Sequence, residues 1–474
     1  MEPKSCCKCR STTTSEPATI RNTTWCRQCF IEQINTKFFQ GLKTAKEYCR
    51  PPPKRDQPAS LVIHFKNDLN SWLTLQLMRN YLNTNQDRST AKWKSPIDFA
   101  TIEVVSIHLA SAAPYFPTQD PLEPLSGDEA ALKASVERLG FAFRILTLDE
   151  LFDPPPSAGS PFVDLSDPNL PIKIIDPAPE TALAPLANAL RPLTQTARRS
   201  MVDSLINTRL LQFCKHTPRN KVLVKTVTST QMAIDALVGV SLGNGWSLDQ
   251  QIGPSSYIDD VLICRPLAQI VDAELAQYSK LMEFDHPYPV TQQAPTKKTD
   301  IPAVITEFVL KLEENYPMTS SVINQTVNKI GKNKPLAPSA SPSTTPSAAT
   351  NGKEGPAPRT CAICHLSADR NADQWKRSIT LSSHGAGPAE DANGATVVQQ
   401  LEHDAPRPTG LRDQLCYACL VTLNDHQYFA PSSRSSHDWV QLPGYYRPLP
   451  GAQPLPQQAA DHVQAVLDQF LISD

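Results

Sequence analysis

The chain has 474 residues, a formal net charge of −2 and a hydrophobic fraction of 40%. At roughly 100 to 200 residues per domain this length suggests two to four domains, and the near-neutral charge excludes a global field that would draw the protein onto nucleic acid. The first residues lack the apolar run of a signal peptide, and no stretch approaches the roughly 18 apolar residues needed to cross a bilayer, so we expect a soluble, cytoplasmic protein without membrane contact.

Proline is frequent, with 44 residues against 17 glycines, so much of the chain is expected to lie outside regular structure. Three stretches, 114–128, 153–190 and 331–360, are rich in proline or serine and poor in large apolar side chains. We expect loops or linkers there, because such segments bury too little apolar surface to offset the entropy lost on ordering.

The N-terminal residues 1–50 combine five cysteines, all within residues 1–30, with a basic segment. A polar helix is expected from Phe30 to about Tyr48, with apolar side chains at helical spacing. The triple proline at 51–53 ends it, because proline cannot continue the hydrogen-bond ladder. We therefore predict a small cysteine-ordered module followed by a basic helix.

Strand and helix patterns alternate from about residue 57 to residue 290. Strands are predicted at Leu61–Phe65, Ile102–Leu109, Ala142–Leu148, Val222–Val227 and Asp260–Cys264. Helices are predicted from about Trp72 to Leu82 and at Glu129–Leu139, Ala197–Phe213, Thr230–Val240 and Leu267–Phe284. This alternation predicts an α/β domain with a mainly parallel sheet.

A further helix at about 301–316 carries Ile305, Phe308, Val309, Leu312 and Tyr316 at helical spacing. It packs either on the sheet domain, which the pattern favours, or on a partner. With this helix the predicted α/β domain covers 57–330.

The remaining chain divides into a linker at 331–358, a second cysteine module at 359–425 and a tail at 426–474. The second module contains a long inserted loop at 380–410. In the tail, Val463, Val466, Leu467 and Phe470 recur at helical spacing and predict a short helix within Ala459–Asp474.

Four Cys-x-x-Cys pairs are candidates for two structural zinc sites, because a two-residue spacer lets two thiolates converge on one ion. The proposed ligands are Cys6, Cys9, Cys26 and Cys29 in the first site and Cys361, Cys364, Cys416 and Cys419 in the second. Residues 10–25 separate the first two pairs, a usual spacing for a zinc knuckle, whereas residues 365–415 separate the last two and must loop out. Reactive redox thiols remain the alternative.

Other side chains near these pairs were weighed as ligands. Cys7 competes with Cys6, and the spacing favours Cys6. His365 directly follows Cys364 and is excluded, because neighbouring side chains rarely reach one ion together. Cys49, Cys214 and Cys264 are isolated in apolar runs, which is typical of small buried side chains.

The turn after the first predicted strand, His64 to Ser71, is where an α/β nucleotide-binding protein would hold phosphate. It contains no glycine, and Asp68 places a negative charge where a phosphate would lie. We therefore expect an ordinary strand–helix turn and no bound ATP.

Seven basic residues against two glutamates lie between Arg27 and Arg55. A basic helix beside a zinc knuckle suits contact with an RNA backbone, and the candidate RNA-binding residues are Lys37, Lys43, Lys46 and Arg50. A simple solvated face is the alternative. A second basic group comprises Arg198, Arg199, Lys215, Arg219 and Lys221.

Several segments together resemble one family: CCKCR…WCRQCF, VTSTQMAIDALVGVSLGNGWSL, DVLICRPL, ITEFVLKLEENYP and CAIC…LCYAC. In this order they are similar to the cytoplasmic tRNA 2-thiolation protein 2 family. The resemblance implies an adenine-nucleotide-α-hydrolase-like (PP-loop-type) domain flanked by N- and C-terminal zinc-finger-like modules. It also implies a heterodimer with a related catalytic subunit.

The family's complex takes sulfur from a thiocarboxylated ubiquitin-related modifier. It delivers that sulfur to the wobble uridine of lysine, glutamine and glutamate tRNAs, giving 5-methoxycarbonylmethyl-2-thiouridine. Catalytic relatives carry a Ser-Gly-Gly-x-x-Ser loop and a Cys-x-x-Cys pair within the sheet domain. Here Lys66 to Ser71 keeps only the final serine, and Thr194 to Arg199 reads TQTARR. The resemblance thus implies a non-catalytic subunit with a degenerate phosphate loop.

Two other functions stay open. The chain is an ATP-using thiolase in its own right if the divergent loop still binds nucleotide, which the missing glycines disfavour. It is a zinc-module scaffold or adaptor unrelated to tRNA if it ignores tRNA altogether. Such modules usually interleave their ligands in one short segment, whereas these two quartets lie far apart in the chain.

Overall fold

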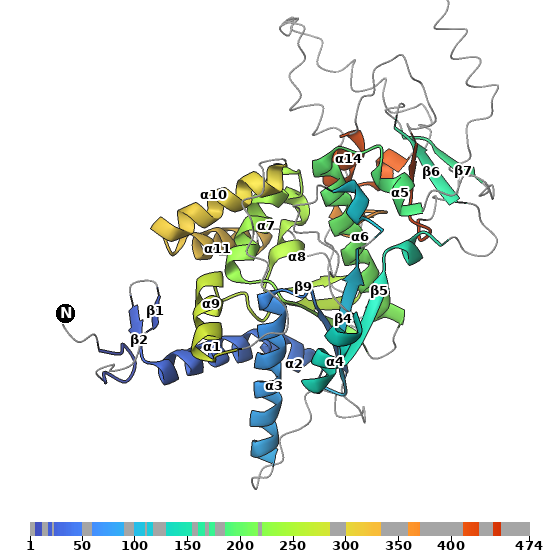
Figure 1. Cartoon of the computed structure of the whole chain (residues 1–474). Helices are drawn as coiled ribbons and strands as arrows, with labels where there is room; N and C mark the ends of the chain where they lie inside the picture. Colours follow the sequence, from blue (N-terminus) through green and yellow to red (C-terminus); the bar gives the residue numbers. More distant parts are fainter. Residues whose placement is uncertain are drawn as a thin grey trace, which may run out of the picture.

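A computed structural model describes most of the chain, and the following account concerns the residues it describes (Figure 1). These are 5–11, 18–20, 23–49, 59–89, 99–109, 111–116, 129–153, 160–165, 170–175, 185–216, 220–284, 300–332, 359–369, 411–425 and 439–446. The predicted tail helix, the inserted loop at 380–410 and Arg50 lie outside them.

The N-terminal segment begins with an antiparallel hairpin of β1 (Ala18–Ile20) and β2 (Thr23–Trp25). The predicted basic helix is present as two helices, α1 (Arg27–Gly41) and α2 (Lys43–Cys49), divided at Leu42. Gly41 fits here because a Cβ on it would lie 2.3 Å from the carbonyl oxygen of Pro266. This close approach holds the end of α1 against the segment that follows strand β10.

The central sheet has six strands in the order β5-β4-β3-β8-β10-β9. Its parallel strands are β3 (Ser60–His64), β4 (Ile102–His108), β5 (Ala142–Thr147), β8 (Asn220–Lys225) and β10 (Val261–Cys264). The predicted α/β class with a mainly parallel sheet is confirmed. An edge strand that the sequence did not suggest, β9 (Ser255–Ile258), pairs antiparallel with β10.

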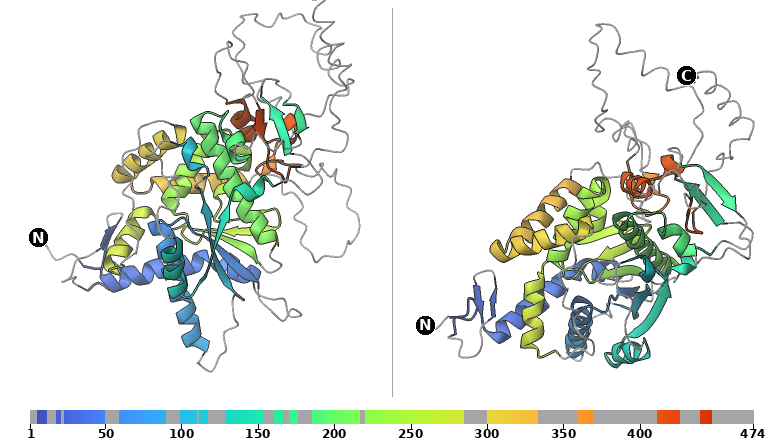
Figure 2. Two further views of the ribbon diagram at one scale, coloured as in Figure 1. Left: turned by 45° about the vertical axis from the view of Figure 1, so that its right-hand side comes forward. Right: turned by 45° about the horizontal axis from the view of Figure 1, so that its top comes forward.

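Helices cover both faces of the sheet (Figure 2). They are α3 (Leu69–Ser89), α4 (Glu129–Arg138), α6 (Gln195–His216), α7 (Ser229–Ser241), α8 (Leu248–Ile252) and α9 (Asp272–Leu281). Short 3₁₀ turns lie at Ala113–Tyr115, Asp149–Leu151, Gly245–Ser247 and Leu411–Gln414. Across the described part of the chain, no helix combines the length and the apolar character that a membrane crossing needs.

Strand side chains alternate between two cores, as the pleat of a sheet requires. Leu61 and Ile63 point into the core shared with α1, α3 and α9. Val62 points into the opposite core, which contains α6 and the second cysteine quartet. The C-terminal cysteine module therefore shares a core with the sheet.

The expectation of loops throughout 153–190 is wrong. This segment contains β6 (Ser160–Asp164), β7 (Ile172–Ile175) and the short helix α5 (Pro185–Leu190). Strand β6 pairs on one side with β7 and on the other with β13 (Trp439–Gln441), near the end of the described chain. Local composition does not reveal such strands, because strand β13, distant in the sequence, supplies part of the pairing that stabilises β6.

The C-terminal half of the described chain adds α10 (Ile301–Asn315) and α11 (Thr319–Lys332), which both pack on α7. The helix α11 was not predicted, and its last residues extend into the expected linker. The second module comprises β11 (Arg359–Thr360), β12 (Ser367–Ala368) and α14 (Tyr417–Asn424), which packs on α6 (Figure 1).

The favoured prediction that the helix at 301–316 packs on the sheet domain is confirmed in part, since α10 packs on α7 but leaves some of its apolar side chains exposed. In α10 only Val309 is fully buried, whereas Phe308 and Tyr316 are exposed by 54% and 67%. The pattern identified the helix correctly, but it does not show which of two apolar stripes packs inward.

Candidate metal centres and the strand–helix turn

The structure gathers the predicted first quartet, Cys6, Cys9, Cys26 and Cys29, so that their sulfur atoms all lie within 4.8 Å of one another. Cys6 and Cys9 lie in a turn held to the hairpin by a hydrogen bond from Cys7 N–H to Thr24 O, 2.9 Å. Cys26 precedes α1 as its N-cap, and Cys29 lies in the first helical turn. Cys7 is exposed and outside the group.

The thiols of this quartet differ in acidity. Burial alone would raise the pKa of Cys6, but hydrogen bonds from the backbone N–H groups of Cys26, Cys9 and Lys8 lower it to about 6. A hydrogen bond with the Cys26 thiol, together with burial, raises the pKa of Cys29 to about 12. Metal binding requires these thiols to lose their protons, because the thiolate is the ligand.

The second quartet, Cys361, Cys364, Cys416 and Cys419, has the same geometry, with all sulfurs within 4.8 Å of one another. Cys361 and Cys364 lie between β11 and β12, while Cys416 is the N-cap of α14 and Cys419 lies in its first turn. All four side chains are buried, at 1% to 7% exposure. All twelve cysteines of the chain are described, and none forms a disulfide.

The two quartets are built alike, which the sequence reasoning missed. Each combines a Cys-x-x-Cys turn with a second pair at a helix N-terminus, as in WCRQCF and LCYACL. The partial positive charge of a helix N-terminus favours thiolate there. Both sets of four sulfurs can therefore hold a metal ion, in contrast with the many cysteine pairs that support only redox exchange.

Polar contacts fix the second module to the sheet domain. Asp425 accepts a 2.6 Å hydrogen bond from Thr194 Oγ1, and Tyr445 Oη donates to the Ile363 carbonyl at 2.7 Å. His365 points its Nδ1 to Asp259 at 2.9 Å and lies outside the quartet. The hydrogen bond with His365 lowers the pKa of Asp259 to about 2.

The turn between β3 and α3 lies beside the end of β8, where the strand order reverses direction and α/β proteins usually bind ligands. Two of its backbone N–H groups and its serine hydroxyl have partners within the fold. Lys66 N–H donates to Ser71 Oγ at 3.0 Å, and Ser71 N–H donates to Asp68 Oδ1 at 2.7 Å. Ser71 Oγ also lies 3.1 Å from Thr226 Oγ1.

The conformation of this turn explains how it closes without glycine. Asn67 adopts a positive φ of 57°, and asparagine tolerates this left-handed region better than most residues. Its side-chain oxygen accepts a 3.0 Å hydrogen bond from Trp72 Nε1. Nearby Lys225, which the sequence did not single out, has its pKa lowered to about 7 by burial.

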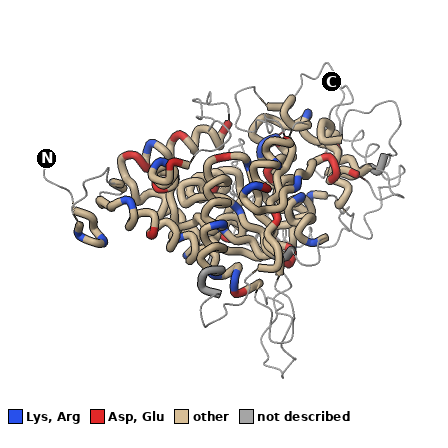
Figure 3. Tube along the Cα trace, turned by 60° about the horizontal axis from the view of Figure 1, so that its bottom comes forward, with Lys and Arg blue, Asp and Glu red and all other residues tan. Residues whose placement is uncertain are grey.

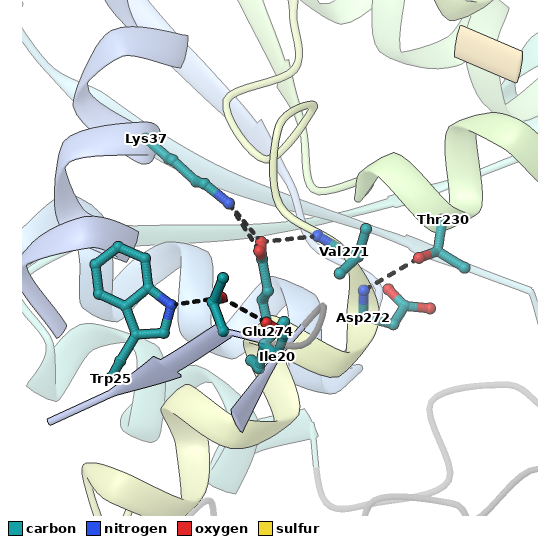
Figure 4. Close-up of polar contacts among 8 residues, drawn as sticks. Ile20, Trp25, Lys37, Thr230, Val271, Asp272 and Glu274 are labelled. Carbon is teal, nitrogen blue, oxygen red and sulfur yellow. Dashed lines mark hydrogen bonds and ion pairs between the residues drawn. The ribbon is translucent and has the colours of Figure 1, made fainter. Parts of the chain in front are cut away.

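The four candidate RNA-binding residues have different surroundings. Lys37 donates to both carboxylate oxygens of Glu274 at 2.8 and 2.7 Å, and Glu274 also accepts from Val271 N–H (Figure 4). Lys46 lies over the Tyr81 ring, 5.0 Å from its centroid. Lys43 is 77% exposed in its side chain, and Arg50 is outside the described residues. Lys37 therefore anchors α1 to α9 and does not face solvent freely.

The second basic group is used mainly within the fold. Arg199 pairs with Asp300 at 2.6 Å, Lys215 pairs with Asp259 at 2.9 Å, and Arg198 donates to backbone carbonyls. Lys and Arg are interspersed with Asp and Glu along the chain (Figure 3). Of the two cations of α2, Lys43 is exposed and Lys46 is partly buried.

Comparison with known proteins bears on this geometry. A family model described as Cytoplasmic tRNA 2-thiolation protein 2 matches residues 300–421. Curated proteins of that name are similar over much of the chain. That of Bos taurus is 25% identical over 62% of this chain and 65% of its own length. That of Homo sapiens is 26% identical over 64% of this chain and 60% of its own length. The predicted resemblance to this family is confirmed, and the matches span less than two thirds of these relatives.

A relative of the same name from Sclerotinia sclerotiorum is 25% identical over 70% of this chain and 83% of its own length. Among solved structures, the U34-tRNA thiolase NcsA from Methanococcus maripaludis covers 71% of this chain and 89% of its own, at 13% identity and a TM-score of 0.42. An NAD⁺ synthetase from Burkholderia pseudomallei covers 68% of this chain and 97% of its own, at 13% identity and a TM-score of 0.30. The fold assignment rests on the strand order of the sheet itself.

The ion pair between Lys37 and Glu274 yields a stability prediction. Lys37→Met keeps the apolar stem but leaves the Glu274 carboxylate, 8% exposed, without its cation. We expect the free energy of unfolding to fall by about 3 kcal/mol in denaturant titrations. Lys43→Met, at a 77% exposed position, is the matched control and should change it by less than about 0.5 kcal/mol. Equal effects of the two variants would contradict the anchoring role.

Proposed function

We propose that this chain is a member of the cytoplasmic tRNA 2-thiolation protein 2 family and serves as the non-catalytic subunit of a cytoplasmic wobble-uridine thiolase. The observation that carries the proposal is the family-model match over 300–421, which includes α10, α11 and the whole second cysteine quartet. The curated relatives of that name from Bos taurus and Homo sapiens match a larger share of the chain, 62% and 64%.

In this role the chain works beside a catalytic subunit that activates the uridine. The sulfur comes from a thiocarboxylated ubiquitin-related modifier, and the target is the wobble uridine of lysine, glutamine and glutamate tRNAs. The turn at Lys66 to Ser71 supports this division of labour, because it lacks glycine and the N–H groups of Lys66 and Ser71 already donate to Ser71 Oγ and Asp68 Oδ1. The chain then contributes tRNA contact and support for the catalytic partner.

The tRNA contact is assigned to the basic helix beside the first quartet. Lys43 is exposed, and Lys46 is partly buried with its ammonium group over the Tyr81 ring. Phosphate contacts of this kind release counterions, so binding weakens as salt rises. Arg50 belongs to the proposed patch by its place in the sequence, and Lys37 contributes less because Glu274 neutralises it.

Both quartets are proposed to hold structural zinc. Tetrahedral Cys₄ sites suit Zn²⁺, and closed sites of this type stabilise the folded state directly. In the second site the ion neutralises thiolates that would otherwise be costly to bury among apolar side chains. Zinc supplies no step of the chemistry in either position.

The functional proposal is tested by measuring 2-thiouridine in total tRNA. Cells that lack the protein should lose 2-thiouridine, and re-expression of the wild-type chain should restore the modification. The variant Lys43→Gln/Lys46→Gln/Arg50→Gln should restore less and should bind tRNA more weakly, with a shallower salt dependence. Lys133→Gln, exposed and outside the basic segment, is the control and should restore fully.

Undiminished 2-thiouridine in the deletion cells would refute the thiolation role and favour the zinc-module scaffold. Full rescue and unchanged tRNA affinity in the triple variant would refute the RNA patch alone.

The metal proposal predicts two zinc ions per chain in elemental analysis of the purified protein. Cys26→Ser and Cys416→Ser should each remove one ion, while Cys7→Ser should keep both. Removing the ion from the second site should lower the melting temperature more than removing it from the first site. The reason is that the sulfurs of the second site are part of the core. Two retained ions in Cys26→Ser would contradict the first site, and iron in place of zinc would contradict the assignment of the metal.

A further inference from the structure

Buried oxygen atoms without a hydrogen-bond partner are concentrated in one part of the fold. Within the described residues, eight buried side-chain nitrogen or oxygen atoms lack a partner. Three of the eight are Glu313 Oε1, Ser320 Oγ and Asn324 Oδ1, which all belong to the helix pair α10 and α11. An unsatisfied polar atom is costly to bury, so this group indicates a bound water molecule or a bound cation.

The surrounding contacts place the three atoms where three helices meet. Both α10 and α11 pack on α7. Glu313 of α10 accepts a 2.8 Å hydrogen bond at Oε2 from Thr230 Oγ1. Asn324 of α11 donates from Nδ2 to the carbonyl and hydroxyl oxygens of Ser229 at 2.8 and 3.0 Å. Ser320 precedes Asn324 by one helical turn and lies on the same side of α11. Since Ser229 and Thr230 are the first two residues of α7, the unpartnered oxygens gather around its first turn.

The orientation of the Asn324 side chain is fixed by its neighbour. The carbonyl oxygen of Ser229 only accepts hydrogen bonds, so the amide presents Nδ2 to it and Oδ1 points away from Ser229. The Ser320 side chain is fully buried, and Asn324 is 7% exposed. The unpartnered oxygens therefore lie inside the helix junction and not at its surface.

The nearest donors of the protein are already used. The N–H group of Ser229 donates to the Ile270 carbonyl at 2.8 Å. The Thr230 hydroxyl donates to Glu313 and accepts a 3.2 Å hydrogen bond from Asp272 N–H (Figure 4). These groups have no further proton for the unpartnered oxygens.

The charge at the junction favours a cation over water. Burial raises the pKa of the Asp272 carboxyl, a hydrogen bond from Thr228 lowers it, and the charges of Glu313 and Asp68 raise it again. Among the ion pairs of the described residues, none includes Glu313 or Asp272. A partly buried negative charge is costly without a positive partner. Water satisfies oxygen acceptors but brings no charge, whereas a cation does both.

We propose that this junction binds one cation through Glu313 Oε1, Ser320 Oγ and Asn324 Oδ1. Carboxylate, amide and hydroxyl oxygens are hard ligands, so they select hard cations such as K⁺, Mg²⁺ and Ca²⁺ over metals that prefer thiolate. The cation joins α10 and α11 to the start of α7, beside the apolar cluster that contains Val327 and Met232. This site is separate from both cysteine quartets and does not rest on the proposed function.

The test measures the melting temperature of the full chain at a constant zinc concentration. KCl, MgCl₂ and CaCl₂ are each titrated against choline chloride at fixed ionic strength. One of the three should raise the melting temperature saturably, because a ligand of the folded state stabilises it. Absence of any saturable rise in the wild-type chain would overturn the proposal.

Two variants assign the effect to the junction. Glu313→Gln keeps an oxygen acceptor for Thr230 but removes the charge, and it should weaken cation binding at least tenfold. Glu314→Gln changes the exposed neighbour on the same helix and should keep the wild-type response. Circular dichroism checks that both variants fold. A folded Glu313→Gln chain with the wild-type cation response would contradict the proposed site.

Anomalous diffraction identifies what occupies the junction. Crystals of the full chain are grown with Rb⁺, Mn²⁺ or Tb³⁺, which replace K⁺, Mg²⁺ and Ca²⁺ respectively. The ion that corresponds to the stabilising cation should give an anomalous peak between Glu313 and Asn324. Density at that position without an anomalous signal from any of the three ions would show a water molecule and overturn the proposal.

Discussion

The burial of four cysteine sulfurs between α6 and α14 is the constraint on which the arrangement of the chain depends. These sulfurs lie within 4.8 Å of one another and form part of the same core as β-strand residues such as Val62 and Leu223. Thiolates in apolar surroundings are costly unless a cation neutralises them. A bound ion would therefore join residues more than 50 positions apart and hold α14 against the sheet domain. The strand β13, which completes the small sheet with β6, depends on the same attachment.

The first quartet has the same construction at the opposite side of the sheet domain. Its second cysteine pair begins α1, and α1 is fixed to α9 by Lys37 and Glu274 and to the Pro266 segment by the close approach of Gly41. The two modules thus attach to opposite cores of one sheet. Between them, at the usual ligand position of an α/β fold, Ser71 lies in hydrogen-bonding contact with Asp68 and Thr226. In the proposed division of labour this chain binds no nucleotide and contributes the two cysteine modules.

Sequence patterns predicted the local features of the fold well. The parallel strands and their helices follow from periodicity, and the cysteine quartets follow from spacing, because both signals are short-range. The strands β6 and β7 were missed because β13, which pairs with β6, lies far along the chain. The role of Lys37 was missed for the same reason, since Glu274 cannot be paired with it from sequence. The outward apolar stripe of α10 was read as core, because periodicity shows a stripe but not what covers it.

The central claim is that this chain acts without a nucleotide of its own, although Lys66 and Lys225 place cations close to the turn. Calorimetric titration of the purified chain with ATP and Mg²⁺ tests it most directly. We expect no saturable heat up to millimolar ATP, because the turn lacks glycine, carries Asp68 and already uses the N–H groups of Lys66 and Ser71 in internal hydrogen bonds. Saturable binding that is lost in Ser71→Ala would contradict the account and show that the chain is itself an ATP-using subunit.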